Sequence, residues 1–376
     1  MEIHMKSVII MLKPASSLCD MRCEYCFYAD VASMRDVKSY GIMQKELVGK
    51  MFEKLSSELC EGDRIQFTFQ GGEPTLAGID FYRDFVTRAA ALKGVSVSYA
   101  LQTNGLHIDR EWCKLLAEYK FLVGISLDLP TELHDAQRKS SSGGGTAKRV
   151  LSAMKLMREC RVDFNVLCTL TRDVAEKPRE VWDAIVGLDI EFTQFTPCLG
   201  ELEGKGESAY ALTPELFASF YKEIFGYWYS AYQRGDRRSI KLFDDVVNQM
   251  ILGRPTGCGM DGVCRPQLVV EADGSTYPCD FYCLDEYKLG NIASNTLGEL
   301  LSSPAVSAFV TRPHIAPRMC EDCPYRRFCG GNCKRMQREM CASRNGDFCG
   351  YRSFLDSCGE TLFSLASAIK ARLFNK

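Results

Sequence analysis

The sequence has few histidines and no excess of basic residues. Its 376 residues include 4 His, which counts against zinc fingers with Cys and His ligands and against histidine as a general base. The 46 basic and 48 acidic residues give a net charge of −2. Because proteins that bind nucleic acid usually carry a basic excess that neutralises phosphates, we expect no nucleic-acid partner.

Long apolar runs are also missing. No stretch approaches the roughly 20 apolar residues needed to cross a bilayer, so we expect no membrane partner. The apolar run Val8–Leu12 is followed by Lys13-Pro14, and it is too short for the core of a signal peptide. These absences predict a location in the cytoplasm.

Cysteine, in contrast, is abundant, with 19 residues. In a small secreted domain such a content would indicate disulfides, whereas in a large chain without an export signal it more often indicates metal sites. We therefore expect metal centres, and the spacing of the cysteines indicates their kind.

Strand and helix patterns alternate over the first half of the chain. Short runs rich in β-branched and aromatic residues lie at Val8–Leu12, Ile65–Phe69, Val95–Leu101, Phe121–Leu127, Phe164–Thr169 and Ile190–Phe195. Between two of these runs, Val150, Met154 and Met157 recur as on one face of a helix. Six such units predict an α/β fold, built as a partial (β/α)6 TIM-like barrel with its chemistry on the loops that follow the strands.

The composition changes in the last third of the chain, where Gly, Pro and Cys become frequent and a final amphipathic helix follows. We expect a barrel domain at residues 1–240, a linker at 241–255, and a cysteine-rich domain with the C-terminal helix at 256–376.

The first cysteine group directly follows the first predicted strand. Cys19, Cys23 and Cys26 have the spacing C-x3-C-x2-C, and three thiolates on one tight loop can hold three irons of a 4Fe–4S cluster. The fourth iron then stays open for a ligand. The alternative is a zinc loop that lacks one ligand, since structural zinc needs four.

These motifs resemble the radical S-adenosylmethionine (SAM) superfamily. Further segments match the family after the next three strands: QGGEPTL at Gln70–Leu76, QTNG at Gln102–Gly105, and SLD at Ser126–Asp128. The resemblance implies that SAM binds the open iron and is cleaved there to a 5′-deoxyadenosyl radical.

The resemblance also implies residues that contact SAM. Gly72 and Glu73 would meet its methionine portion, and Arg138 would pair with its carboxylate. Tyr25 would pack on the adenine, Ser126 would contact SAM, and Leu199 would offer its backbone to the adenine. Each residue has a structural alternative, such as a turn glycine, a helix cap or a surface ion pair.

A second cysteine group in the last third of the chain suffices for two four-thiolate sites, although pairs of the C-x2-C type also suit zinc ribbons. The pattern resembles the SPASM extension of radical SAM enzymes that modify peptides. By that resemblance, one auxiliary 4Fe–4S cluster is held by Cys258, Cys264, Cys279 and Cys333, and the other by Cys320, Cys323, Cys329 and Cys349, giving three clusters in all. Cys283 and Cys341 lie close enough to replace an assigned ligand.

Nearly the whole chain resembles anaerobic sulfatase-maturating enzymes. The segments that carry this resemblance include KPASSLCDMRCEYCFY, FQGGEPTLAG, CGMDGVC and DGSTYPCDFY. The resemblance implies oxidation of a cysteine or serine to Cα-formylglycine, in a Cys/Ser-x-Pro/Ala-x-Arg segment of a sulfatase polypeptide. It also implies an electron donor such as flavodoxin or ferredoxin.

Asp280 directly follows the predicted ligand Cys279, so it must lie beside an auxiliary cluster. A carboxylate there resembles the base that deprotonates the substrate thiol or hydroxyl, with a strand-end cap as the structural alternative. Gln70 is a further candidate for substrate contact. Two other functions stay open: another SPASM enzyme that crosslinks or epimerises peptides, and a non-catalytic binding module stabilised by zinc.

Overall fold

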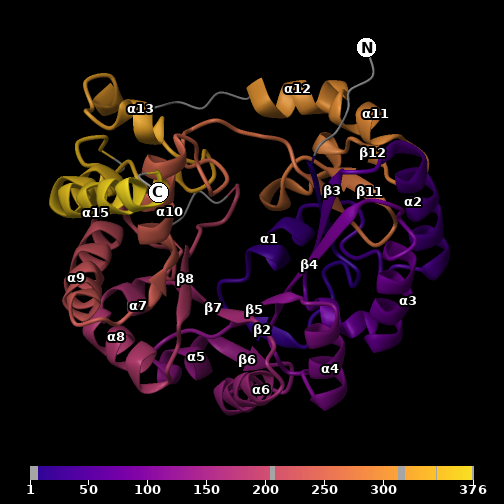
Figure 1. Ribbon diagram of the computed structural model, residues 1–376, viewed down its shortest axis with the longest axis horizontal. Helices are drawn as coiled ribbons and strands as arrows, with labels where there is room; N and C mark the ends of the chain where they lie inside the picture. Colours follow the sequence, from indigo (N-terminus) through magenta and orange to yellow (C-terminus); the bar gives the residue numbers. More distant parts are fainter. Residues whose placement is uncertain (1–6, 204–207, 312–317, 344, 375–376) are drawn as a thin grey trace. The chain divides into compact units, whose positions relative to one another are not determined.

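The computed structural model describes the chain except residues 1–6, 204–207, 312–317, 344 and 375–376 (Figure 1). It comprises two compact units, each built from segments far apart in the sequence. The first unit contains Met1–Ser126, Arg138–Phe164 and Pro266–Arg312, and the second contains Leu127–Gln137, Asn165–Arg265 and Pro313–Lys376.

The first unit is built on a sheet whose central strands are parallel. These are β1 (Ser7–Leu12), β3 (Arg64–Phe69), β4 (Ser96–Thr103) and β5 (Leu122–Ser126), which pair in that order. Alternate side chains of β3 are buried, and Phe67 packs edge-on against Phe85 of the neighbouring helix α3, with 4.9 Å between ring centroids. Helices α2 (Lys45–Glu58), α3 (Ile79–Ala89) and α4 (Arg110–Glu118) lie along one side of these strands (Figure 1).

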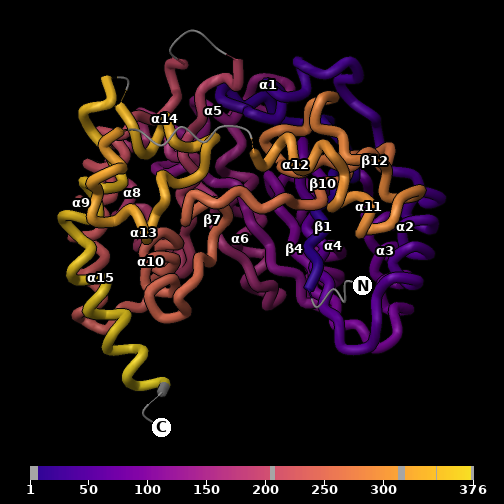
Figure 2. Tube along the Cα trace, turned by 90° about the horizontal axis from the view of Figure 1, so that it is seen from above, coloured from indigo at the N-terminus to yellow at the C-terminus, as the bar shows by residue number. Residues whose placement is uncertain are grey.

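A later segment of the chain extends this sheet. Strand β10 (Leu268–Val270) pairs in parallel with β1, and β11 (Ser275–Tyr277) and β12 (Gly290–Asn291) follow in antiparallel order. Figure 2 shows β10, in orange, beside β1, in indigo. Residues that follow β10 and β11 are thereby brought to the end of β1, where the first cysteine group begins.

The first cysteine group lies between β1 and the short helix α1 (Phe27–Ser33). Within it, β2 (Met21–Cys23) pairs antiparallel with β6 (Arg138–Ser140). The remaining helices of this unit are α6 (Ala147–Glu159), α11 (Leu297–Leu301), α12 (Pro304–Thr311) and the 3-10 turns η1 (Pro74–Ala77), η2 (Asp280–Tyr282) and η3 (Asp285–Tyr287).

The second unit has the parallel strands β7 (Phe164–Leu170), β8 (Phe192–Pro197) and β9 (Ser239–Ile240), of which β7 begins at the last residue of the first unit. Its helices are α5 (Thr131–Gln137), α7 (Arg172–Ala175), α8 (Pro178–Gly187), α9 (Pro214–Gln233), α10 (Lys241–Leu252), α13 (Arg326–Cys329), α14 (Gln337–Met340), α15 (Gly350–Phe374) and the turn η4 (Arg318–Cys320). Apolar faces of three helices meet in its core, where Phe243 of α10 stacks on Phe354 of α15 and contacts Tyr221 of α9.

The α/β class and all six expected strands are confirmed, each within a few residues. The linker expected at 241–255 is a helix over most of its length, α10. Phe243 and Val246 lie on one buried face of this helix, which explains why the segment is helical. The expected domain boundaries stay a prediction. Among the described residues, no helix combines the length and apolar character needed to cross a membrane.

Candidate active site

The structure places Cys19, Cys23 and Cys26 on one half-buried loop. Cys26 is the N-cap residue of α1, and its N–H donates to the carbonyl of Cys23 at 3.2 Å. The N–H of Met21 donates to Cys19 Sγ at 3.3 Å. Burial raises the pKa of Cys19 to about 12, so the thiolate needs a nearby positive charge, which the irons of a cluster would supply. Three sulfur donors on one loop fit the predicted cluster.

The second glycine of QGGEPTL lies directly against this cysteine loop. Gly72 N–H donates to Ser16 O at 2.9 Å, and Glu73 N–H donates to Leu18 O at 2.7 Å. A Cβ on Gly72 would sit 2.1 Å from Leu18 O, which is far inside van der Waals contact. Glycine is therefore required here to let β3 support the loop; the contact of Gly72 with SAM stays a prediction.

We expect Gly72→Ala to lower the free energy of unfolding by about 1–3 kcal/mol and to reduce iron in the first cluster, because the new methyl group displaces the loop. Urea denaturation and iron analysis measure both effects. Gly226→Ala in α9 is the matched control, since a Cβ there meets no atom within 4 Å and alanine favours a helix. A Gly72→Ala protein with unchanged stability and iron content would contradict the close contact.

Glu73 is fully buried, and its carboxylate is held by protein donors. Oε1 accepts from Thr75 N–H at 3.0 Å and from Thr103 Oγ1 at 2.8 Å, and Oε2 accepts from Asn104 N–H at 2.7 Å. Burial raises the pKa of Glu73 against the effect of these donors. The side chain thus joins the end of β3 to the end of β4, and the contact of Glu73 with SAM stays a prediction.

Three other predicted SAM contacts lie at strand ends of the first unit. Arg138 pairs with Cys23 in the β2–β6 ladder, and its guanidinium lies over the Tyr25 ring at 5.4 Å. Ser126 ends β5, where its Oγ accepts from Gln102 Nε2 at 3.1 Å. The structure therefore brings Tyr25 and Arg138 to the cysteine loop.

Leu199 belongs to the second unit, on the loop after β8, and is buried. The next residue fixes this backbone, because Gly200 N–H donates to Glu339 Oε1 at 3.1 Å and Gly200 O accepts from Arg335 Nη2 at 2.5 Å. Residues of the C-terminal cysteine segment thus hold the loop that carries Leu199.

Asp280 is buried in the first unit, at the start of η2, and Cys279 is the N-cap residue of that turn. Lys13 Nζ lies 3.0 Å from its Oδ1 in an ion pair, and the Tyr28 hydroxyl donates to its Oδ2 at 2.6 Å. The same hydroxyl lies 3.1 Å from Oε1 of Gln70. Burial and the Asp280 charge raise the pKa of Tyr28 well above its usual value, so Tyr28 stays protonated as the donor.

The cysteines predicted for the second auxiliary cluster gather in the second unit. Cys320, Cys323, Cys329 and Cys349 line one cavity, and Cys341 lines it as well. A hydrogen bond from Cys341 lowers the pKa of Cys349 to about 6, while the pKa of Cys341 is raised well above its usual value. The two sulfur atoms are thus in hydrogen-bond contact, and Cys349 as the cluster ligand stays a prediction.

We therefore expect Cys349→Ala to remove one cluster, leaving about eight irons per chain of about twelve, and Cys341→Ala to keep all three clusters. Iron and sulfide analysis of the anaerobically loaded proteins measures this difference. The reverse result, with iron lost in Cys341→Ala alone, would assign Cys341 as the ligand.

Three cysteines predicted for the other auxiliary cluster are also close together. Gly259 has a φ of 72°, and a Cβ on it would lie 2.8 Å from Cys333 Cβ. Burial, with the neighbouring Cys333 and Cys264, raises the pKa of Cys258 to about 11. The fourth predicted ligand, Cys279, belongs to the first unit. Within the described ranges, no three His, Cys, Asp or Glu side chains are arranged to hold a single metal ion.

Comparisons with known proteins show the family of this chain. The model of the radical SAM superfamily matches residues 14–181, and that of the SPASM iron–sulfur cluster-binding domain matches residues 258–324. A cysteine-type anaerobic sulfatase-maturating enzyme of Clostridium perfringens is 38% identical over 97% of this chain and 100% of its own length. The chain belongs to the anaerobic sulfatase-maturating enzyme family.

Other members and solved structures extend the comparison. A serine-type enzyme of Bacteroides thetaiotaomicron is 28% identical over 88% of this chain and 83% of its own length. The solved structure of native anSMEcpe with bound AdoMet is 37% identical, with a TM-score of 0.88 over 96% of this chain and 100% of that chain. A further structure of that protein holds both AdoMet and a peptide, with a TM-score of 0.87.

Membership confirms the radical SAM and SPASM predictions and SAM and iron–sulfur clusters as the cofactors. Membership therefore argues against the alternative of a binding module stabilised by zinc. The roles of individual residues stay predictions.

Sequence reasoning missed two residues of this family member's site, Lys13 and Tyr28. Lys13 directly follows the first strand, and in barrels of this type the catalytic groups lie on the loops after the strands. Its position in the sequence could therefore have identified it as a site residue. Tyr28 lies two residues after Cys26 and carried no separate signal.

Proposed function

We propose that this radical SAM oxidoreductase converts a cysteine of a sulfatase polypeptide to Cα-formylglycine. The observation that carries the proposal is the buried Asp280 carboxylate, placed next to Cys279 and held between Lys13 and Tyr28. Cysteine is favoured over serine because cysteine-type relatives are 38% and 34% identical to the chain, whereas serine-type relatives are 28–29% identical.

In this proposal Cys19, Cys23 and Cys26 hold the cluster that binds SAM, and the two SPASM sets hold the auxiliary clusters. When bound, these groups supply a radical that takes a hydrogen atom from the substrate and a path for the remaining electron. Tyr25 and Arg138 orient SAM beside the cysteine loop.

Asp280 supplies the acid–base part of the reaction. Oxidation of –CH2–SH to –CH=S removes one hydrogen atom, one proton and one electron. The carboxylate takes the proton from sulfur directly or through one water. The Tyr28 hydroxyl donates to this carboxylate at 2.6 Å. Water then replaces sulfur in the thioaldehyde, which gives the aldehyde and hydrogen sulfide.

The proposal extends to partners and location. The substrate is an unfolded segment of the form Cys/Ser-x-Pro/Ala-x-Arg, and a flavodoxin or ferredoxin supplies electrons. The cytoplasm, where thiols stay reduced, suits a chain with this many cluster-binding cysteines.

The test is anaerobic incubation of the loaded enzyme with SAM, a reductant and a short Cys-x-Pro-x-Arg peptide. Mass spectrometry is expected to show the mass loss for replacement of CH2–SH by CHO. The same peptide with Ala in place of Cys is the control. An unchanged cysteine peptide, or a crosslinked or epimerised product, would contradict the proposal.

A further inference from the structure

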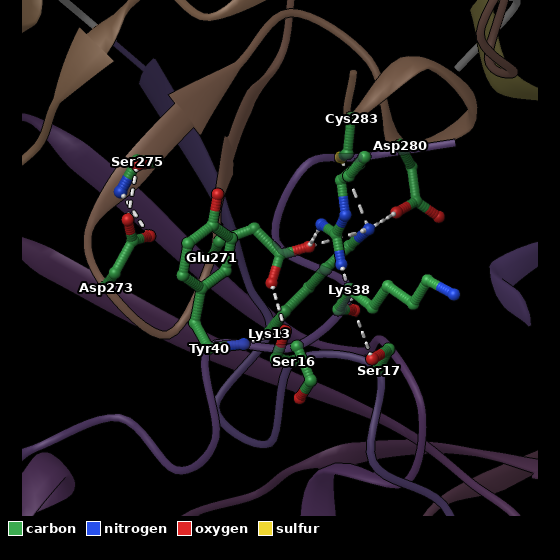
Figure 3. Close-up of polar contacts among 12 residues, drawn as sticks. Lys13, Ser16, Ser17, Lys38, Tyr40, Glu271, Asp273, Ser275, Asp280 and Cys283 are labelled. Atoms are coloured by element: carbon green, nitrogen blue, oxygen red, sulfur yellow. Dashed lines mark hydrogen bonds and ion pairs between the residues drawn. The ribbon is translucent and has the colours of Figure 1, made fainter. Parts of the chain in front are cut away.

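Lys13 carries a buried positive charge at the end of β1. Its side chain is 3% exposed, and a buried ammonium is costly unless it is paired. Its Nζ lies 3.0 Å from Asp280 Oδ1, 3.2 Å from Cys283 Sγ and 3.7 Å from Glu271 Oε1. Figure 3 shows Lys13 extending between Glu271 and Asp280, with Cys283 beside it.

Glu271 has a cation of its own. Arg35 Nη1 lies 2.5 Å from Glu271 Oε1, and Ser16 Oγ donates to Oε2 at 2.8 Å. This group of residues thus contains two cations and two carboxylates. Since Arg35 is the nearer cation to Glu271, Lys13 is left as the partner of Asp280.

We propose that Lys13 is a positioning residue that fixes the Asp280 carboxylate for proton transfer; this rests on the proposed function. Lys13 holds Oδ1 while Tyr28 holds Oδ2, so contacts on both oxygens set the rotation of the carboxylate. Lys13 N–H also donates to Val270 O at 2.8 Å, which ties the end of β1 to β10.

The test compares Lys13→Met with Lys38→Met in the loaded enzyme. We expect Lys13→Met to keep SAM cleavage but to lower formylglycine formed per 5′-deoxyadenosine at least about tenfold, because the carboxylate loses one of its two anchors. Lys13→Arg keeps the charge and restores part of the ratio. Lys38 is exposed and its side chain points away from this group (Figure 3), so Lys38→Met is expected to keep the wild-type ratio.

A double variant separates positioning from general damage. If Lys13 acts through Asp280, Lys13→Met lowers the ratio no further in an Asp280→Asn background. A further fall of the ratio in the double variant would overturn the positioning role of Lys13. The same holds if Lys13→Met keeps the wild-type ratio while Asp280→Asn loses product. Neither result would contradict the proposed role of Asp280 as the base. Full product from Asp280→Asn would instead contradict the proposed base. Should Lys13→Met fail to fold, Lys13→Arg decides: a ratio no better than that of Asp280→Asn overturns the role of the charge.

Discussion

Replacing Cys19, Cys23 and Cys26 together by Ala abolishes SAM cleavage and leaves about eight irons per chain. The three residues share one loop, so their removal takes every protein ligand from the first cluster and none from the SPASM sets. The second unit holds seven of the eight cysteines that are predicted to bind the auxiliary clusters, and its packed core of α9, α10 and α15 is untouched by the change. Iron analysis and chromatographic detection of 5′-deoxyadenosine measure the two effects.

The control for this triple variant is Cys60→Ala, because Cys60 is exposed and lies outside both cysteine groups. We expect the control to keep about twelve irons and full SAM cleavage. Cleavage that persists in the triple variant would show that the loop does not hold the reactive cluster.

Asp280→Asn keeps the clusters and SAM cleavage but lowers formylglycine formation by about 100- to 10,000-fold, the range that general acid–base groups contribute. The amide has nearly the same shape and still accepts from Tyr28, yet it cannot take a proton. Hydrogen-atom removal does not need the carboxylate, so 5′-deoxyadenosine forms without the product. The ratio of product to 5′-deoxyadenosine is the measurement.

Asp285→Asn is the matched control, five residues farther along the same segment. Asp285 is exposed, and its Oδ2 accepts from the N–H of Asp36 at 2.9 Å. This substitution is expected to leave the ratio unchanged. Full turnover by Asp280→Asn would remove that carboxylate from the mechanism.

Local patterns made much of the fold and of the site predictable. Each of the six βα strands is a short run of β-branched and aromatic residues, and this pattern can be recognised without knowing which strand it pairs with. The cysteine groups can also be recognised from the sequence, because ligands of one cluster recur at short spacings along the chain. Cys19, Cys23 and Cys26 are therefore found on one loop, and the four cysteines of one SPASM set line one cavity.

The remaining contacts of the site could not be predicted, because they depend on pairing between strands that are far apart in the sequence. Lys13 meets Asp280 and Glu271 because β10 pairs with β1 across more than half of the sequence, and a three-residue strand gives little signal of its partner. Glu73 likewise meets Thr103 and Asn104 because β3 and β4 end side by side. Its side chain is used inside the protein, which its motif alone did not indicate.

The most direct measurement of the central claim follows one deuterium atom. The enzyme is incubated with SAM and a peptide whose reactive cysteine carries deuterium on Cβ. The account predicts that formylglycine forms and that 5′-deoxyadenosine gains a deuterium from the peptide. Product formation with unlabelled 5′-deoxyadenosine would contradict hydrogen abstraction from the substrate Cβ by this radical SAM enzyme.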